Sequence, residues 1–407
     1  MNQINTEVLI IGAGPSGCVS AAYMHKKGID TIMVEKDHFP RYVIGESFLP
    51  RSMDHYQEVD LLDCLVAQNF EKKYGARFIR GNDVCNFDFS KKFTKGWNWT
   101  WQAPRADFDK ALSDEIEKRG IDLRFGTEVI DVQFNGTDSI TTIKNENGTK
   151  EQIHAKFIID SSGYGRVLPR LLGLETPSAL PKHSSIFTQV KDIKRPEGRE
   201  GTLITFDIVK PEVWFWMIPF SNGNASIGFV GPTEFIESYK GNTTEVLNEM
   251  LKLTDYYYER FKNVVFLFDP IKIKNFSKSA KQLYGDGYAL TGNSAAFLDP
   301  VFSSGVAFAT ESGLLAAKLA AHQLAGEKVN WEEDYAGYIN KGVAVFTSYV
   351  NEWYTTNLQK LFFHKPENHD VKEKICAVLA GYVWDENNPF VKKHDRVITS
   401  MAHLIEM

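Results

Sequence analysis

Val8-Leu9-Ile10-Ile11-Gly12-Ala13-Gly14-Pro15-Ser16-Gly17, with Glu35 further on, is the stretch that decides the fold of this chain. An apolar run cut off by glycine indicates a buried strand, and Pro15 suits the first turn of a helix. That helix is expected to end near Lys27 and to lead into a second parallel strand, Ile29 to Glu35. Such a βαβ unit is the context in which Gly-x-Gly-x-x-Gly binds a dinucleotide.

Each glycine of this motif has its own task. Gly12 permits a tight turn, Gly14 lets the backbone approach a pyrophosphate, and Gly17 lets the helix pack on the strand. The helix N-terminus presents free N–H groups to phosphate oxygens, and Glu35 can accept hydrogen bonds from a ribose. The contacts predicted at this end are Gly12, Gly14, Pro15, Ser16, Gly17, Glu35 and Lys36.

A second segment more than two hundred residues later points to FAD rather than a nicotinamide cofactor. A strand over Tyr288 to Leu290 leads into Thr291-Gly292-Asn293, and Asp299-Pro300 precedes a glycine-containing helix start. This layout can place a polar side chain on a ribityl hydroxyl and N–H groups near a flavin ring. An ordinary strand–turn–helix connection is the competing interpretation. The predicted contacts are Gly292, Asn293, Asp299, Pro300, Ser303, Ser304, Gly305 and Val306.

Size and composition describe an ordinary globular protein. With 407 residues the chain exceeds the usual size of one core, so we expect two lobes. The net charge of −6 argues against nucleic-acid binding, and no apolar run approaches membrane-spanning length. The four cysteines and the histidines show no metal spacing, so no metal site is predicted. We expect a protein of the reducing cytoplasm.

The remaining pattern predicts a discontinuous α/β protein. A helix is expected over 107–119, followed by a three-stranded antiparallel meander over 128–134, 140–144 and 152–159, with Asn-Gly turns between its strands. Residues 180 to 275 are rich in strands and aromatics, with one helix expected near 244–260. A long helix is expected over 304–324, and the chain after Trp331 is expected to be mostly helical.

The predicted architecture is therefore a Rossmann-like FAD-binding domain with a β-rich substrate domain and a helical C-terminal region. The segments 1–75, 101–175 and 280–330 are assigned to the FAD-binding domain. The segments 76–100 and 176–279 are assigned to the substrate-binding sheet, and 331–407 to the C-terminal region.

Seven motifs carry a resemblance to a known family. They are Gly12-x-Gly14-x-x-Gly17; Arg41-x-x-x-Gly45-Glu46-Ser47-x-x-Pro50; Lys73-Tyr74-Gly75-Ala76-x-Phe78; Gln102-x-x-Arg105-x-x-Phe108-Asp109; Asp160-Ser161-Ser162-Gly163; Trp214-x-Trp216-x-Ile218-Pro219; and Asp299-Pro300-x-x-Ser303-Ser304-Gly305-Val306. Over about residues 5 to 325 the chain resembles flavoproteins of the para-hydroxybenzoate hydroxylase fold. Within them it most resembles flavin-dependent halogenases that act on phenols or carrier-bound pyrroles.

The resemblance implies further cofactor contacts. Arg41 and Arg105 are expected along the FAD, where a guanidinium suits phosphate and carbonyl oxygens; without the resemblance, surface ion pairs would be the simpler interpretation. The other positions implied are Gly45, Glu46, Ser47, Gln102, Val129, Asp160, Ser162 and Gly163.

The resemblance also implies three catalytic residues. Lys73 would meet hypohalous acid, either forming a chloramine or polarising it by hydrogen bonding, whereas a solvated lysine is the alternative. Trp214 and Trp216 have the period of a strand and can share one face, where they would separate substrate from flavin; ordinary aromatic core is the alternative. The similar Trp97-to-Trp101 stretch is interpreted as a strand of the substrate lobe.

Two departures keep other functions open. The halogenase tryptophan motif begins with glycine, where this chain has Val213, and the usual Gly-Asp of the second FAD motif is Gly292-Asn293. Geranylgeranyl reductases share the fold and carry a related tryptophan motif.

The leading hypothesis is a halogenase or monooxygenase that uses reduced FAD and oxygen on an electron-rich aromatic small molecule. A halide would be its co-substrate, and a separate flavin reductase or a transient NAD(P)H encounter would supply the reducing equivalents. The alternatives are an FAD-dependent dehydrogenase or reductase of a prenyl or polyene substrate, and a non-catalytic flavin-binding module.

Overall fold

The computed structural model describes residues 2–178 and 180–406, and its first sheet has the predicted Rossmann-like core. β1 and β10 lie at its centre, with β2 and β7 following on one side and β19 on the other, all parallel. The strands, in spatial order, are β18 (Tyr284–Gly285), β19 (Tyr288–Leu290), β10 (Lys150–Asp160), β1 (Asn2–Ile11), β2 (Thr31–Val34) and β7 (Asp122–Arg124).

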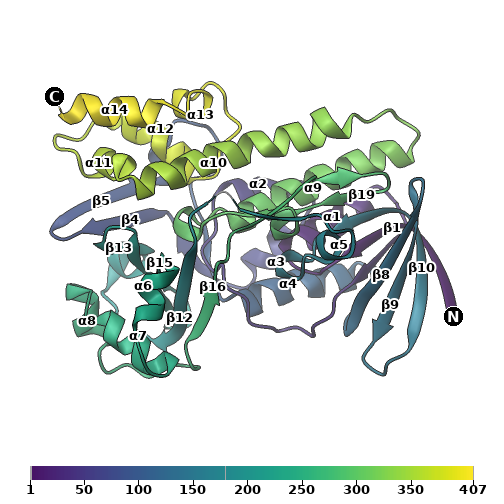
Figure 1. The fold of residues 1–407 in the computed structure, drawn as a ribbon, viewed down its shortest axis with the longest axis horizontal. Helices are drawn as coiled ribbons and strands as arrows, with labels where there is room; N and C mark the ends of the chain where they lie inside the picture. The colour runs from purple at the N-terminus through teal and green to yellow at the C-terminus, as the bar shows by residue number, and fades with distance from the viewer. Residues whose placement is uncertain (1, 179, 407) are drawn as a thin grey trace.

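The predicted meander is confirmed. β8 (Thr127–Asn135), β9 (Asp138–Asn145) and β10 pair antiparallel, and the chain reverses at Gly136 and Gly148, both with positive φ. β9 pairs with the first half of β10, and β19 pairs with its last three residues. The meander therefore fans out from the sheet at one end of the molecule (Figure 1).

Helices cover the parallel sheet. They are α1 (Pro15–Lys26), α2 (Arg51–Glu58), α3 (Leu62–Val66), α4 (Arg105–Lys118), α5 (Val167–Leu171) and α9 (Gly305–Leu324). α1, α4 and α9 confirm the three helices that the sequence predicts. α1 and α9 pack closely at Gly313, which has no side chain. A Cβ there would stand 2.6 Å from Ser16 Oγ, so only glycine allows this approach.

A second sheet of seven strands forms the other lobe. Its order is β16 (Ile271–Lys274), β12 (His183–Lys191), β15 (Asn224–Pro232), β14 (Val213–Pro219), β13 (Thr205–Lys210), β4 (Gly75–Arg80) and β5 (Asp83–Asp88). One face packs on α6 (Thr233–Ser238), α7 (Thr243–Leu251) and α8 (Asp255–Phe261). The expectation of one helix here is wrong, because the helical conformation is interrupted at Leu253 and Thr254, between α7 and α8.

Short elements join the two lobes. β3 (Glu71–Lys73) pairs with β6 (Thr100–Gln102), and β17 (Lys278–Ala280) lies between β11 (Glu175–Pro177) and β20 (Ala296–Phe297). The 3-10 turns are Phe89–Lys91, Gly163–Gly165, Gly198–Thr202, Gly292–Ser294 and Pro300–Phe302. The prediction of a substrate-lobe strand over Trp97 to Trp101 is wrong, because only its last two residues enter β6. The three indoles pack edge-to-face on one another and belong to the core of the parallel sheet.

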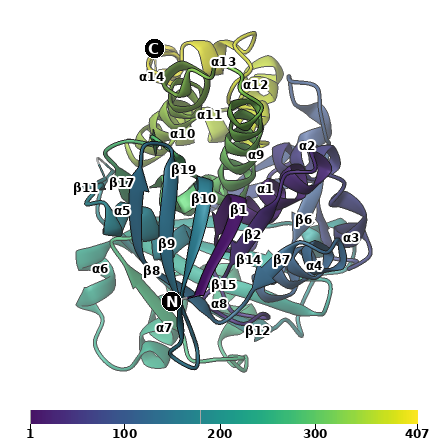
Figure 2. The same ribbon diagram turned by 90° about the vertical axis from the view of Figure 1, so that its right-hand side faces the viewer.

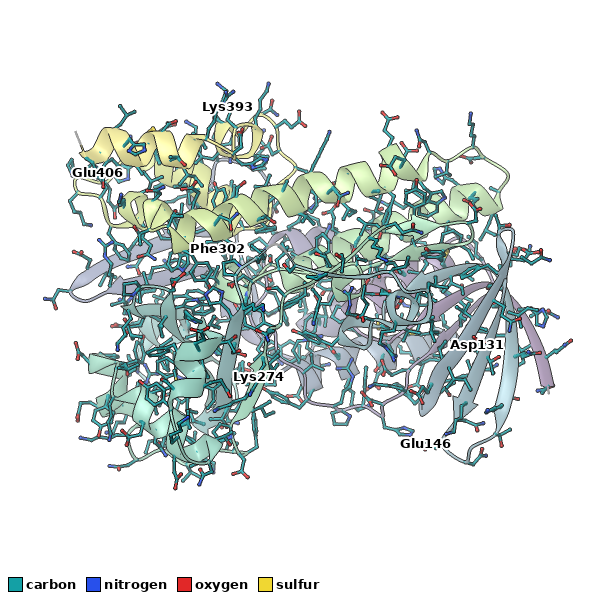
Figure 3. The ribbon with its side chains drawn as sticks, in the orientation of Figure 1. Asp131, Glu146, Lys274, Phe302, Lys393 and Glu406 are labelled. Carbon is teal, nitrogen blue, oxygen red and sulfur yellow. The ribbon has the colours of Figure 1, made fainter. Side chains whose placement is uncertain are left out.

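The C-terminal region is helical, as predicted. It comprises a π-helical turn (Trp331–Gly337), α10 (Tyr338–Tyr354), α11 (Asn357–Phe363), α12 (His369–Leu379), α13 (Pro389–Lys392) and α14 (Val397–Glu406). α10 runs beside α9 and then over the seven-stranded sheet (Figures 1 and 2). Phe302 lies under α10 (Figure 3), where its ring meets those of Tyr349 and Trp353.

These helices share one core with the substrate sheet, since Trp353 packs on Phe78 of β4 as well as on Phe302. The three domain ranges stay a prediction. Across the described ranges, no helix is both long and apolar enough to cross a membrane.

We predict that Trp353→Ala destabilises the whole protein. The side chain is 1% exposed and contacts three phenylalanine rings, so truncation leaves a cavity that costs about 3–5 kcal/mol. Chemical denaturation measures the change. Tyr256→Ala, at a side chain that is 55% exposed on α8, serves as the control. Equal stability of the Trp353 variant and wild type would show that α10 is not anchored here.

Candidate active site

Three hydroxyl groups from distant segments meet at the carboxyl edge of the parallel sheet. Ser16 Oγ donates to Thr291 Oγ1 over 2.8 Å, and Ser161 Oγ lies 2.8 Å from the same oxygen. Thr291 Oγ1 in turn donates to the Asp160 carbonyl over 3.1 Å. All are buried, so the starts of α1 and of the 3-10 turn after β19 are fixed against the end of β10.

The glycines make this junction possible. Gly12 has a φ of +100°, and a Cβ there would stand 2.5 Å from the Ser161 carbonyl oxygen. A Cβ on Gly17 would stand 2.0 Å from the Gly12 oxygen. Gly14 is different, because its Cβ would meet only Arg41 Nη2, at 3.8 Å. Gly12 and Gly17 therefore shape the turn, whereas Gly14 faces open space.

A cavity of about 350 Å³ runs from this turn to the second sheet. Twenty-two predicted residues lie on its wall: Gly14, Pro15, Ser16, Glu35, Lys36, Arg41, Gly45, Glu46, Ser47, Arg105, Ser162, Gly163, Trp214, Trp216, Gly292, Asn293, Asp299, Pro300, Ser303, Ser304, Gly305 and Val306. Both sequence segments that suggested a dinucleotide therefore border one space.

At one end, the cavity meets the N-terminus of α1. Gly14 is the N-cap and offers no side chain, so the first N–H groups of the helix have no side-chain cap. Glu35 accepts the N–H of Ala13 over 3.0 Å, which fixes its carboxylate beside the turn. Free helix N–H groups and a carboxylate suit a phosphate and a ribose respectively.

The two arginines share one buried carboxylate, that of Asp109. Arg105 binds it in a fork, with distances of 2.8 and 2.9 Å, and Arg41 donates to it over 3.2 Å. Asp109 is completely buried one helical turn after Arg105. Arg41 also lies 4.0 Å from Glu35 and 3.9 Å from Asp37, so nearby carboxylates balance the two guanidinium groups, which still present N–H donors to the cavity.

At the other end, a C-terminal residue reaches the cavity wall. Tyr354 of α10 donates to Asp299 Oδ2 over 2.9 Å and accepts the indole N–H of Trp214 over 3.2 Å. The ring of His183 stacks on Tyr354 with centroids 4.3 Å apart. Burial raises the pKa of Asp299 to about 6. α10 thus supports the wall of the site through Tyr354.

Lys73 lies directly behind this wall. Its ammonium donates to Ser47 Oγ over 2.9 Å and to the Phe48 carbonyl over 2.8 Å, and it is 2% exposed. Burial lowers its pKa from 10.5 to about 7. Ser47 lines the cavity and Lys73 does not. The hydrogen bond to the serine hydroxyl therefore links the amine to the cavity wall.

The second sheet closes the cavity with aromatic side chains. Trp214 and Trp216 share one face of β14, with ring centroids 6.0 Å apart, and Trp216 donates to Ser226 Oγ. Val213 belongs to the opposite face, in the core beneath α7 and α8. The valine that departs from the halogenase pattern therefore points away from the cavity.

Six predicted residues lie off the cavity wall: Gly12, Gly17, Lys73, Gln102, Val129 and Asp160. Asp160 accepts the N–H groups of Ser162 and Leu168 and so builds the turn. Gln102 donates to the Thr202 and Pro219 carbonyls between the lobes, and Val129 packs in the core.

Sequence reasoning missed several residues of the site. Asp109 could have been found from its i,i+4 spacing to Arg105. Thr291 precedes the glycine of the second motif, but its hydroxyl contacts depend on tertiary structure. His183 and Tyr354, like the wall residues Ser185, Ile204, Phe206, Ile273 and Phe276, carry no local signal.

Comparison with known proteins agrees with this geometry. The model of a family described as FAD binding domain matches residues 5–322. The chain belongs to this family. It is an FAD-dependent oxidoreductase, and FAD is its cofactor, as the sequence predicted.

Relatives and solved structures support the predicted resemblance. A flavoprotein/dehydrogenase structure from Cytophaga hutchinsonii is 50% identical, with a TM-score of 0.97 and 99% of each chain covered. A Pseudoalteromonas luteoviolacea brominase of 1H-pyrrole-2-carbonyl groups on a peptidyl-carrier protein is 26% identical over 386 residues, covering 93% of this chain and 92% of the relative. The structure of the flavin-dependent brominase Bmp2 shares the fold, with 24% identity, a TM-score of 0.86, and coverage of 98% and 99%.

We predict that Gly14→Val strongly weakens FAD binding without unfolding the flavoprotein. The new side chain meets open space in the protein and occupies the space expected for the pyrophosphate. Fluorescence titration should show FAD affinity reduced by about a hundredfold, or about 2.7 kcal/mol, with the thermal midpoint of the FAD-free protein preserved. Gly12→Ala, by contrast, should lower that midpoint because its Cβ meets backbone. Unchanged FAD affinity in folded Gly14→Val would refute the placement.

Lys73→Met tests the buried amine. In the unfolded protein Lys73 keeps its proton up to about pH 10.5, whereas in the folded protein it loses the proton near pH 7. Deprotonation therefore favours the folded state, and this lysine makes the stability of the wild type rise between these two pH values. The stability of Lys73→Met relative to wild type should therefore fall by about 2–3 kcal/mol from pH 6 to pH 9. Lys72→Met, at an exposed neighbour, is the control. A stability difference between Lys73→Met and wild type that does not vary with pH would mean that Lys73 keeps its charge.

Proposed function

We propose that this flavoprotein is a halogenase that uses reduced FAD, dioxygen and a halide to halogenate an electron-rich aromatic compound. The observation that carries the proposal is Lys73: a buried amine with a pKa near 7, one hydroxyl away from the cavity wall. Among the described residues it has no carboxylate partner, so burial alone sets its protonation. An amine that is partly neutral at pH 7 can take part in proton transfer or act as a nucleophile.

The relatives support the same chemistry. Besides the pyrrole brominase, a tryptophan 2-halogenase of Chondromyces crocatus is 28% identical over 401 residues, covering 93% of this chain and 76% of that enzyme. The departure at Val213 does not oppose the proposal, because this side chain packs on the face of β14 that faces away from the cavity.

FAD fits the cavity through the residues already described. Gly14, Pro15 and Ser16 would receive its phosphates, Glu35 its ribose, and the segment from Asp299 to Val306 the flavin end. When bound and reduced, FAD supplies two electrons, with which dioxygen and halide become hypohalous acid and water. Lys73 would then orient the hypohalous acid through Ser47 Oγ. Trp214 and Trp216 would hold the aromatic substrate apart from the cofactor.

A dehydrogenase is the second candidate. The observation that favours it is the 50% identical flavoprotein/dehydrogenase structure, which is more similar in sequence than the halogenases described above. In that function Lys73 has no chemical role, and the substrate is a prenyl or polyene compound that gains or loses two hydrogens.

Partners and location follow from the halogenase proposal. A halide is consumed, and a separate flavin reductase supplies the electrons, because the one Rossmann motif of the sequence is assigned to FAD. All four cysteines are free, which suits a reducing cytoplasm.

We predict that Lys73→Ala abolishes halogenation while leaving FAD content and oxygen consumption nearly unchanged. Without the amine the oxidant forms but is not oriented, so halogenated product should fall by about a hundredfold or more. Lys73→Arg should not restore it, because a guanidinium stays charged. Mass spectrometry of products from phenols, pyrroles and prenyl lipids, with reduced FAD, oxygen and chloride or bromide, measures the change.

Lys72→Ala, at the exposed neighbour on β3, is the control and should keep wild-type product. Halogenated product that survives Lys73→Ala contradicts the assigned role. No halogenation of any aromatic, together with saturation of a prenyl lipid under anaerobic conditions, contradicts the halogenase and supports the dehydrogenase.

A further inference from the structure

The Trp216 indole lies over β15, in a space that this neighbouring strand leaves free. Residues of β15 alternate between the two faces of the sheet, so Ser226 and Gly228 stand on the cavity side, while Ile227 belongs to the core beneath α7 and α8. A Cβ on Gly228 would stand 2.6 Å from Cζ2 and from Cη2 of Trp216. The φ of Gly228 lies outside the left-handed region, so its backbone does not require glycine. The absent side chain therefore makes room for the indole.

Two contacts fix the indole in this space. Trp216 Nε1 donates to Ser226 Oγ over 3.1 Å, and Ser226 is completely buried. The ring also reaches Phe187 on β12, the strand beyond β15, with ring centroids 5.9 Å apart. Trp216 itself remains 6% exposed and lines the cavity, whereas Phe187 and Ser226 do not. One edge of the indole is thus held by the sheet, and the ring borders the cavity.

The Ser226 hydroxyl has a second neighbour, the carboxylate of Glu46. Burial raises the pKa of Glu46 to about 7, and hydrogen bonding to Ser226 and Gln189 opposes this rise. Gln189 donates to Glu46 Oε1 over 2.6 Å. A hydroxyl can donate to a carboxylate and accept from an indole at the same time. Ser226 therefore connects Trp216 to a carboxylate that is itself fixed.

We propose that Ser226 is a positioning residue that holds Trp216 back against β15, and that this position sets the width of the aromatic ring that the cavity admits. The substrate part of this inference rests on the proposed halogenase function. Without the serine hydroxyl, the indole N–H would be buried with no acceptor, which is costly. The ring would then turn toward the cavity, where water can accept the N–H, and it would occupy space at the flavin end.

Hydrogen exchange of the indole N–H groups tests the contact itself, on protein loaded with oxidised FAD and without any substrate. With ¹⁵N-labelled tryptophan, the Trp216 signal is assigned by its absence from Trp216→Phe. Ser226→Ala should speed exchange of this N–H about tenfold or more, because the N–H loses its acceptor and meets water. The N–H of Trp214, which Tyr354 accepts, should exchange as in wild type. Unchanged exchange at Trp216 overturns the proposal.

Phenol and 2-naphthol test the consequence for ring size. Calorimetric titration of the FAD-loaded protein should show that Ser226→Ala weakens binding of 2-naphthol about tenfold and binding of phenol less than about twofold. Only the wider ring needs the space from which the indole is held back. Ser184→Ala removes another buried serine hydroxyl, which hydrogen-bonds to Thr233 from β12. This variant is the matched control and should bind both compounds as wild type does.

A double-mutant cycle separates the effect of Ser226 on Trp216 from its effect on Glu46. Phenylalanine has no N–H, so on the Trp216→Phe background Ser226→Ala should leave binding of both compounds unchanged. A loss of affinity that persists on this background assigns the effect to Glu46 and overturns the proposal. Equal losses for the two rings, or no saturable binding of 2-naphthol to wild type, overturn the role in ring size. Because no halide or reductant is present, these results stand apart from the halogenation assay, whose failure would bear on the halogenase alone.

Discussion

The site depends on the hydrogen-bonded cluster of Ser16, Ser161 and Thr291. These three hydroxyls come from segments up to 275 residues apart, and they fix the ends of β10 and β19 against the first turn of α1. Their approach requires Gly12, because any side chain there would collide with the Ser161 carbonyl. Once this edge of the sheet is fixed, the uncapped N-terminus of α1, the Glu35 carboxylate and the second glycine segment face one cavity.

Signals confined to a few neighbouring residues allowed much of the fold to be predicted. The glycine motif with its apolar strand indicated the Rossmann unit, and the Asn-Gly pairs indicated the meander. Alternation along β14 indicated that Trp214 and Trp216 share a face, and both do line the cavity. Prediction failed for most of the Trp97 stretch, which pairs as a strand only at Thr100 and Trp101 and whose three indoles pack edge-to-face on one another.

Features that depend on burial or on distant contacts could not be predicted. The sequence does not distinguish Lys73 from Lys72, yet one is buried behind Ser47 and the other is exposed. Nor does it show that Asp109 holds both cavity arginines, or that Tyr354 joins α10 to Asp299 and Trp214. These contacts decide the charges on the wall, and therefore the chemistry that the cavity can support.

Burial makes the Lys73 amine titratable near neutral pH beside the cavity, and the proposed chemistry depends on this. The direct measurement is an NMR titration of the FAD-loaded protein with ¹³C-labelled lysine, in which the Lys73 Cε signal is assigned by its absence from Lys73→Met. We predict a midpoint near pH 7 for this signal. A midpoint near the ordinary lysine value of 10.5 would contradict it, because the amine would then stay charged throughout turnover.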